Sequence, residues 1–173
     1  NYHKNKLDFS KFTKIGQNNF NDFSLVLVAR GMTELNLEAL ETLGGNCFNN
    51  LSGGIRTLKV PLLREADNSF STTVLTKIDV PSLETIGSNC FSDNNSVVND
   101  FTFPSLHTIL GQGNFCNLPN VFYLTMRKLA KIDAKNNFQG LTSLSQIVVS
   151  AGINPGSVSH LKSSVGASKI RRV

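Results

Sequence analysis

The sequence contains no tryptophan, and only three cysteines, three histidines and two methionines occur among its 173 residues. An odd number of cysteines is not typical of a disulfide scaffold. The sequence also lacks the Cys-x-x-Cys or mixed Cys/His spacing that indicates a metal site. No apolar run approaches the roughly 20 residues that a membrane-spanning helix needs. We therefore expect no metal, no disulfide framework and no insertion into a membrane.

Signatures of catalysis are also missing. The sequence has no Gly-x-Ser-x-Gly elbow, no His-Glu-x-x-His pair and no phosphate-binding loop. Its histidines, His3, His107 and His160, are too scattered along the chain to meet. We therefore predict that the protein is not an enzyme and needs no cofactor.

Charge is sparse and slightly basic, with 17% charged residues, a net charge of +5 and a pI near 9.3. A nucleic-acid-binding protein gathers its basic residues into a patch or stripe. Here they lie mainly near the two ends of the chain, so we expect solvated surface charge and no specific nucleic-acid binding. An anionic partner is the alternative. These basic residues are Lys4, Lys6, Lys11, Lys14, Lys162, Lys169, Arg171 and Arg172.

Phenylalanine is abundant, with 12 residues, and the phenylalanines recur in step with an internal repeat. The first sign of the repeat is a series of seven apolar-x-apolar triplets. Their starts lie 20 to 28 residues apart, most often 23, within the range of about 20–29 residues that leucine-rich repeats show. The triplets occupy residues 7–9, 35–37, 58–60, 78–80, 101–103, 124–126 and 147–149.

Further apolar positions follow the first six triplets at constant offsets. The first set is Phe12, Leu40, Leu63, Leu83, Leu106 and Leu129, and three residues later come Ile15, Leu43, Ala66, Ile86, Ile109 and Ile132. A phenylalanine column completes each unit: Phe20, Phe48, Phe70, Phe91, Phe115 and Phe138. Because aromatic pairs are stabilised beyond their buried area, we expect this column to stack from coil to coil.

The triplets predict an α/β-type repeat solenoid of the leucine-rich repeat class. Short apolar-x-apolar strands are too short to be stable alone, but parallel stacking pairs each backbone with both neighbours. We expect a right-handed coil with a parallel β-sheet on its concave face, irregular turns on its convex face and a C-terminal helical cap. Because the strand period is two, the outer residues of each triplet point inward and the middle residue points outward.

Small and polar residues recur at the turns. Gly16, Gly44, Gly87 and Gly111 follow the second apolar position, where we expect turns with positive φ. Asparagine recurs two residues before the phenylalanine, where we expect its amide to bond nearby backbone groups. Cys47 and Cys90 share one repeat position two units apart, beyond disulfide reach, and we expect buried free thiols. Asn50 and Asn94 begin glycosylation sequons, which occur often by chance.

The repeat stops after Ser150. Asn154-Pro155 followed by Val158, Leu161 and Val165 predicts a helix that Asn154 caps and Gly166 ends. Residues 169–173 can then return as a short edge strand; the basic tail can instead bind an anion or continue into a further domain. We therefore divide the chain into a repeat region, 1–150, with about seven strand units, and a C-terminal cap, 151–173.

Residues 80–91, VPSLETIGSNCF, carry a family resemblance. They resemble the BspA-like class of leucine-rich repeats, whose motif is Ile-x-x-x-x-Phe after a strand and a proline. The resemblance covers roughly residues 5–150, although Cys47 and Cys90 replace the small alanine of that class and the last repeat lacks its phenylalanine. It implies a module of a surface, secreted or host-interacting protein, with an extracellular or cell-surface location. The sequence shows no signal peptide, but it does not begin with Met, so we expect a processed protein or a fragment.

The candidate binding site is the outward side of the strands, because the concave face is the usual binding surface of a solenoid. We expect it to bind a protein, or a glycan, and we select polar outward residues together with one Tyr and one Arg that resemble interface anchors. The leading hypothesis is a non-catalytic interaction or adhesion module; the alternative is a structural or docking component of a larger assembly, such as a virion or appendage. The selected residues are Asp8, Asn36, Lys59, Asp79, Thr102, Thr125, Tyr123 and Arg127.

Overall fold

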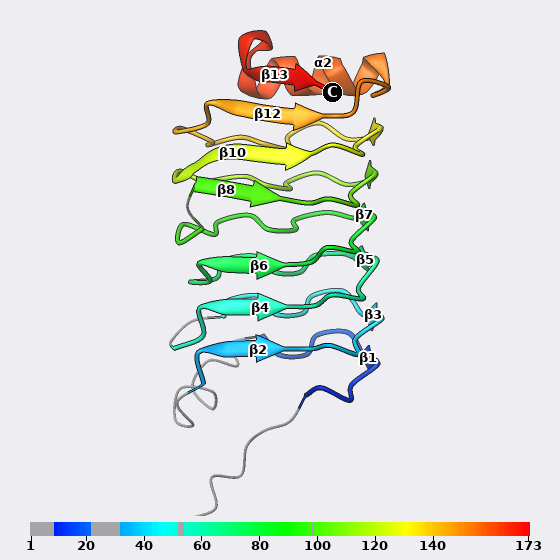
Figure 1. Ribbon diagram of the computed structural model, residues 1–173, viewed down its shortest axis with the longest axis vertical. Coiled ribbons are helices and arrows are strands. Elements are labelled where there is room, and N and C mark those ends of the chain that lie inside the picture. The colour runs from blue at the N-terminus through cyan, green and yellow to red at the C-terminus, as the bar shows by residue number, and fades with distance from the viewer. Residues whose placement is uncertain (1–8, 22–31, 52–53, 98) are drawn as a thin grey trace, which may run out of the picture.

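The computed structural model describes residues 9–21, 32–51, 54–97 and 99–173. Figure 1 shows a stack of coils in which each turn of the chain lies on the one before it. One row of parallel strands runs along the stack and corresponds to the predicted triplets. Its strands are β2 (Glu34–Asn36), β4 (Thr57–Lys59), β6 (Lys77–Asp79), β8 (Asn99–Thr102), β10 (Val121–Met126) and β12 (Gln146–Val149). The triplet at 7–9 lies largely outside the described residues.

A second row of two-residue strands follows the right-hand edge of the stack in Figure 1. The sequence predicted irregular turns away from the first row, but here the backbone is regular enough to pair in parallel. The second apolar column supplies the last residue of each strand. These strands are β1 (Lys14–Ile15), β3 (Thr42–Leu43), β5 (Glu65–Ala66), β7 (Thr85–Ile86), β9 (Thr108–Ile109) and β11 (Lys131–Ile132).

The alternation predicted for the first row is confirmed in its packing. In β2, Leu35 and the following Leu37 are buried while Asn36 is only half-buried, and the later strands repeat this pattern. Val148 is an exception: it occupies an outward position but is only 7% exposed. Its neighbours in register are Thr125 on β10 and Arg171 on the C-terminal strand. The side chain at position 148 is thus more covered than the period-two rule predicts.

The first row is divided into two sheets. Strands β2, β4 and β6 form one, and β8, β10 and β12 belong to another, with no pairing between β6 and β8. Figure 1 shows the wider interval between these two strands. Ile78 and Phe101, which face inward on either side of the interval, are nevertheless buried. The hydrophobic core therefore continues past a break in the backbone hydrogen bonds.

The phenylalanine column stacks as predicted. Neighbouring rings from Phe20 to Phe138 are parallel to within 12°, with centroids 5.2–5.7 Å apart. Phe101 on β8 and Phe103, just after β8, meet the ring of Phe91 edge-on. Most rings of the column are fully buried, so they combine a large buried apolar area with favourable aromatic geometry.

In the turn that carries this column, every second residue has a left-handed backbone. Asn46, Phe48 and Asn50 have φ of 58°, 57° and 56°, and equivalent residues in the other coils are similar. Their backbone N–H groups point alternately up and down the stack: Asn46 donates to Asp67 in the next coil, and Phe48 to Asn19 in the previous one. A left-handed non-glycine residue costs about 1 kcal/mol or more, and these hydrogen bonds and the ring stack offset that cost.

Positive φ was predicted at Gly16, Gly44, Gly87 and Gly111, and this was wrong: none of these residues has it. Three of them are required by close approach of the coils. A Cβ at Gly44 would lie 2.5 Å from the backbone nitrogen of Gln17, and one at Gly111 would lie 2.6 Å from that of Ser88. The left-handed positions fall instead on the asparagine and phenylalanine columns, where an inter-coil hydrogen bond and a packed ring hold the backbone.

Asn19 is exposed, but the residue just before each later phenylalanine of the column is buried and joins its neighbours by hydrogen bonds. The Asn114 Oδ1 accepts from the Cys90 backbone at 2.7 Å, and the Asn137 Oδ1 accepts from the Asn114 backbone at 2.8 Å. Each amide Nδ2 donates to carbonyls at the preceding turn. These side chains thus supply hydrogen-bond partners to backbone groups of the turns, which burial of backbone requires.

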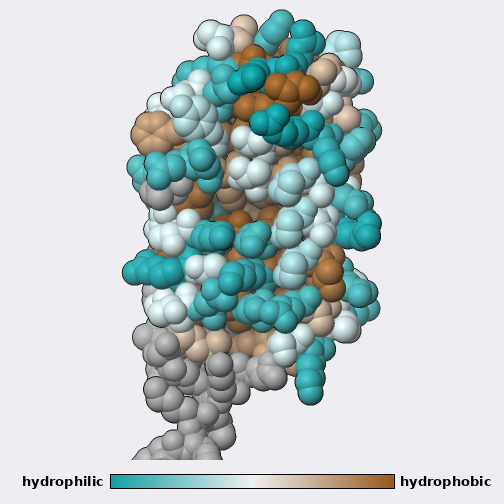
Figure 2. Space-filling model, viewed as in Figure 1, coloured by the Kyte–Doolittle hydropathy of each residue, from teal (hydrophilic) through white to brown (hydrophobic). Residues whose placement is uncertain are grey.

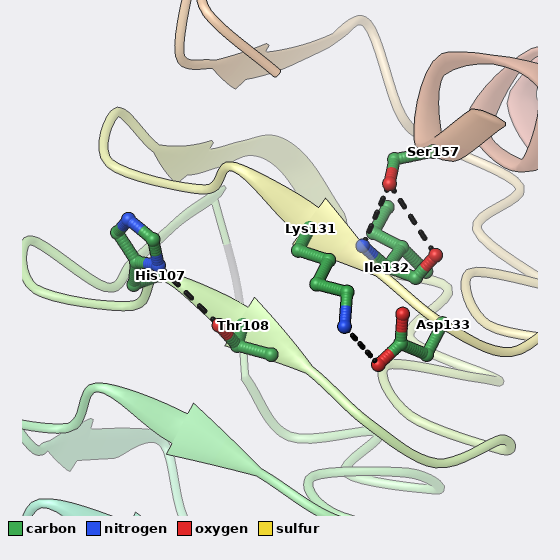
Figure 3. A network of polar contacts seen from close by, with 6 residues as sticks. All are labelled: His107, Thr108, Lys131, Ile132, Asp133 and Ser157. Carbon is green, nitrogen blue, oxygen red and sulfur yellow. Dashed lines mark hydrogen bonds and ion pairs between the residues drawn. The ribbon is translucent and has the colours of Figure 1, made fainter. Parts of the chain in front are cut away.

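The C-terminal end of the stack is closed by helix α2 (Pro155–Val165), the short 3-10 helix η1 (Ala167–Lys169) and strand β13 (Ile170–Arg172). The Asn154 side chain accepts from the Gly156 N–H, and Gly166 has φ of 84°, so both predicted helix ends are confirmed. Strand β13 extends the first row by pairing with β12. Helix α2 covers the second row: Ser157 bonds to both backbone groups of Ile132 on β11 (Figure 3).

Candidate interaction surface

The outward side of the first strand row, which we call the front face, carries all the described candidate residues. The register places Asn36, Lys59 and Asp79 side by side on β2, β4 and β6. Thr102 and Thr125 are paired on β8 and β10. Asp8 lies outside the described residues. Because β6 and β8 are not paired, the front face consists of two patches and not one continuous array.

The first patch, on β2, β4 and β6, is charged and largely self-paired. The Lys59 Nζ lies 2.8 Å from the Glu34 Oε1. The hydrogen bond to Glu34 is the main cause that raises the pKa of Lys59 above its ordinary value. Asn36 donates to the Glu38 Oε1 at 2.7 Å. Exposed pairs of this kind contribute little to stability, so the patch is a polar surface in which Lys59, Glu34 and Glu38 have partners within the chain.

The second patch lies around β10 and contains a β-bulge that the period-two pattern did not predict. Tyr123 pairs with Asp100 and Val121 with Asn99, so Phe122 is an extra residue on β10. As a result Phe122 and Tyr123, though adjacent in sequence, are both exposed, by 44% and 48%. A bulge re-aims side chains in this way. Two large aromatic side chains therefore project from adjacent positions of this strand.

Phe122 was not selected from the sequence, although a signal for it exists. Val121 and Leu124 are both buried and lie three positions apart, an odd spacing that a strand of period two cannot place on one face. Only an extra residue between Val121 and Leu124 allows both side chains to face the core. Arg127 and Thr102 are exposed and Thr125 is half-buried, so the second patch combines aromatic, cationic and small polar groups.

Figure 2 shows the hydropathy of this side of the molecule. Hydrophilic and neutral colours cover most of it, and hydrophobic colour gathers near the top, over β12 and β13. Among the residues that the structure describes, no helix is long and apolar enough to cross a membrane.

Groups with catalytic or metal-binding chemistry do not converge in the described part of the chain. It contains no group of three His, Cys, Asp or Glu side chains that could hold a metal. His107 is exposed and contacts only the neighbouring Thr108 hydroxyl in Figure 3, at 3.3 Å. Lys131 and Asp133, also drawn there, form a surface ion pair at 2.9 Å.

The three cysteines are free thiols, as predicted. Burial raises the pKa of Cys90 to about 12 and also raises the pKa of Cys47 and Cys116. A thiolate is the nucleophilic form of cysteine, so the raised pKa lowers the reactivity of these side chains. Asn94, the start of one glycosylation sequon, is fully buried and bonds to Thr73 and Phe70, which leaves its amide inaccessible in the folded protein.

Comparison with family models identifies the chain. The model described as the BspA type leucine-rich repeat region matches six copies over residues 64–165. This is more than half of the chain, and the protein therefore belongs to the BspA-type leucine-rich repeat family. Leucine-rich repeat domains typically mediate protein interactions and are generally not enzymes, and those of BspA type are typically found in surface proteins. Comparison with curated proteins and with solved structures gives no match.

Proposed function

We propose that the protein is a non-catalytic adhesion module of a secreted or surface protein, and that it binds a protein partner on its front face. In this proposal the repeat region, 1–150, is a right-handed solenoid whose front face is concave, and residues 151–173 cap it. The observation that carries the proposal is the bulge on β10, which exposes Phe122 and Tyr123 together.

Exposed aromatic residues and arginine are the residue types that most often dominate protein interfaces. Arg127 lies four residues after Tyr123 in the sequence. A partner that covers the Tyr123 side chain can therefore also contact the Arg127 side chain. Asp100, paired with Tyr123, supplies an acceptor at the rim. The other selected residues, Asn36, Lys59, Asp79, Thr102 and Thr125, form the surrounding polar surface in this proposal.

The experiment is site-specific photo-crosslinking. A benzophenone amino acid replaces Tyr123 in one sample and Leu62 in another; Leu62 is 45% exposed at a turn outside the strand row. Each sample is irradiated with the surface fraction of the source organism, and partners crosslinked only through position 123 are identified. The affinity of a purified partner is then measured for Phe122→Ala, Tyr123→Ala and Arg127→Ala.

Each of these variants is expected to weaken binding by about tenfold, the typical effect of truncating an interface anchor. Leu62→Ala and Leu110→Ala, which remove equally exposed apolar side chains elsewhere, are expected to leave the affinity within twofold. Affinity that survives all three front-face substitutions would refute this site. A partner crosslinked equally through position 62 would favour a structural component of a larger assembly.

A further inference from the structure

The C-terminal end of the stack has a cleft that the proposed front-face site does not use. It lies between helix α2 and strand β13 and has a volume of about 330 Å³. Its apolar lining includes Ile153, Val158 and Ile170, while Lys162 and Arg172 provide its charge. The cleft therefore combines apolar side chains with two cationic ones.

The two cations have no acidic partner within the described part of the chain. None of the ion pairs found there involves Lys162 or Arg172. The sequence explains this, because Asp133 is its last acidic residue and no Asp or Glu follows through Val173. The positive charge of the cleft can thus pair with an acidic group of another molecule.

Strand β13 also has an open edge. It is the terminal strand of its sheet, and within the part of the chain that the structure describes it pairs only with β12. Val173 donates to the Val149 carbonyl at 3.0 Å. Because backbone groups alternate from side to side along a strand, the N–H and carbonyl of Arg172 point away from β12. An open edge of this kind can accept a further strand.

We propose that this end of the stack binds an extended acidic peptide of a partner protein, which adds a strand to β13. Its backbone pairs with the open edge, an apolar side chain enters the cleft between Val158 and Ile170, and flanking carboxylates meet Lys162 and Arg172. Charge argues against a second copy stacked head to tail, because the first described coil, at the other end of the stack, is also basic, with Lys11 and Lys14 exposed.

The test uses the whole chain and short fluorescent peptides, with binding measured by fluorescence anisotropy. The main probe is Glu-Val-Glu-Val-Glu, blocked at both ends. The comparison peptides are Lys-Val-Lys-Val-Lys, which reverses the charge, and Glu-Ser-Glu-Ser-Glu, which removes the apolar side chains. A single-stranded oligothymidylate tests for a nucleic-acid site. We expect binding of the main probe, at least tenfold weaker binding of both comparison peptides, and affinity that falls as salt is raised.

Lys162→Glu combined with Arg172→Glu is expected to weaken binding of the main probe by about tenfold. Lys128→Glu combined with Lys135→Glu is the matched control: it makes the same change in net charge at exposed positions outside the cleft and leaves binding within twofold. Tyr123→Ala also leaves it unchanged, which separates this site from the front face.

Hydrogen exchange of the Arg172 backbone amide gives a readout that needs no variant. The exchange slows when the peptide pairs with β13 and is unchanged when it does not. Absence of peptide binding, equal affinity for the serine peptide, unchanged Arg172 exchange, or tighter binding of the oligothymidylate would each overturn the proposal. Unchanged exchange would mean that the basic residues serve only to protect an exposed edge, and tighter binding of the oligothymidylate would mean that they form a general anion-binding surface.

Discussion

The Ser157 hydroxyl lies 2.7 Å from the Ile132 backbone nitrogen, from which it accepts a hydrogen bond, and donates to the Ile132 carbonyl oxygen at 3.3 Å. Every earlier strand of the β5–β11 sheet has a following strand to satisfy these two backbone groups. At β11, the last strand of that sheet, one side chain from α2 takes the place of the missing backbone. The helix thus closes the second row through a contact that is both buried and specific.

Ser157→Ala is expected to destabilise the protein by about 1–3 kcal/mol, because it leaves a buried N–H and a buried carbonyl without partners. Urea unfolding measures the change. The control is Ser163→Ala on the same helix, whose exposed hydroxyl bonds only to the His160 carbonyl, and a change below about 0.5 kcal/mol is expected there. Equal effects of the two substitutions would contradict the assigned contact.

Phe91→Ala is expected to cost about 3–5 kcal/mol, the usual range for removing a buried phenylalanine. Phe91 is fully buried and stacks between Phe70 and Phe115, at centroid distances of 5.4 and 5.6 Å. Chemical denaturation compares it with Phe122→Ala, which removes the same side chain from the surface and is expected to cost about 0.5 kcal/mol or less. If the phenylalanine stack contributes little to stability, the two variants will have similar denaturation midpoints.

Gly44 and Gly45 are adjacent, but their substitution by alanine should have different effects. A Cβ at Gly44 would lie 2.5 Å from backbone of the preceding coil, whereas one at Gly45 would have its nearest neighbour at 3.7 Å. Gly44→Ala is expected to lower the thermal midpoint, because backbone of two coils must separate. Gly45→Ala is expected to leave it unchanged or slightly raised through the unfolded state. A lower thermal midpoint for Gly45→Ala than for Gly44→Ala would contradict this packing of the coils.

Cys90 is expected to resist alkylation by iodoacetamide at pH 8 in the folded protein and to react quickly in denaturant, as mass spectrometry can measure. Its pKa is raised from 9.0 to about 12 by burial, so the folded state retains the proton that the unfolded state loses. The associated stability is complete below pH 9 and is lost as the pH rises from 9 towards 12. Cys90→Ala should show a weaker loss over that interval; an equal loss would assign the effect to other groups.

Much of the fold could be predicted from the spacing and the local properties of particular residues. The inward positions, such as Leu35, Phe70 and Ile86, follow from spacing alone, because every coil must bury the same side of its backbone. The ends of α2 could be predicted because Asn154, Pro155 and Gly166 act locally. Phe122 could not be selected in the same way, since its exposure depends on how β10 aligns with β8. The binding roles assigned to the front-face residues remain predictions.

The sequence by itself determined the repeat, its apolar columns, the stacked phenylalanines and the capping helix, because each depends on short-range spacing and on burial repeated in every coil. Only the tertiary structure decided the break between β6 and β8, the left-handed asparagines and phenylalanines, and the close approach at Gly44. These features depend on distances between coils. Backbone hydrogen bonds, and differences of a few tenths of an ångström in contact distance, decide which conformation is stable there. The cleft beside β13 belongs to the same group, since residues from α2, η1 and β13 form it only after the chain has folded back on the last coil.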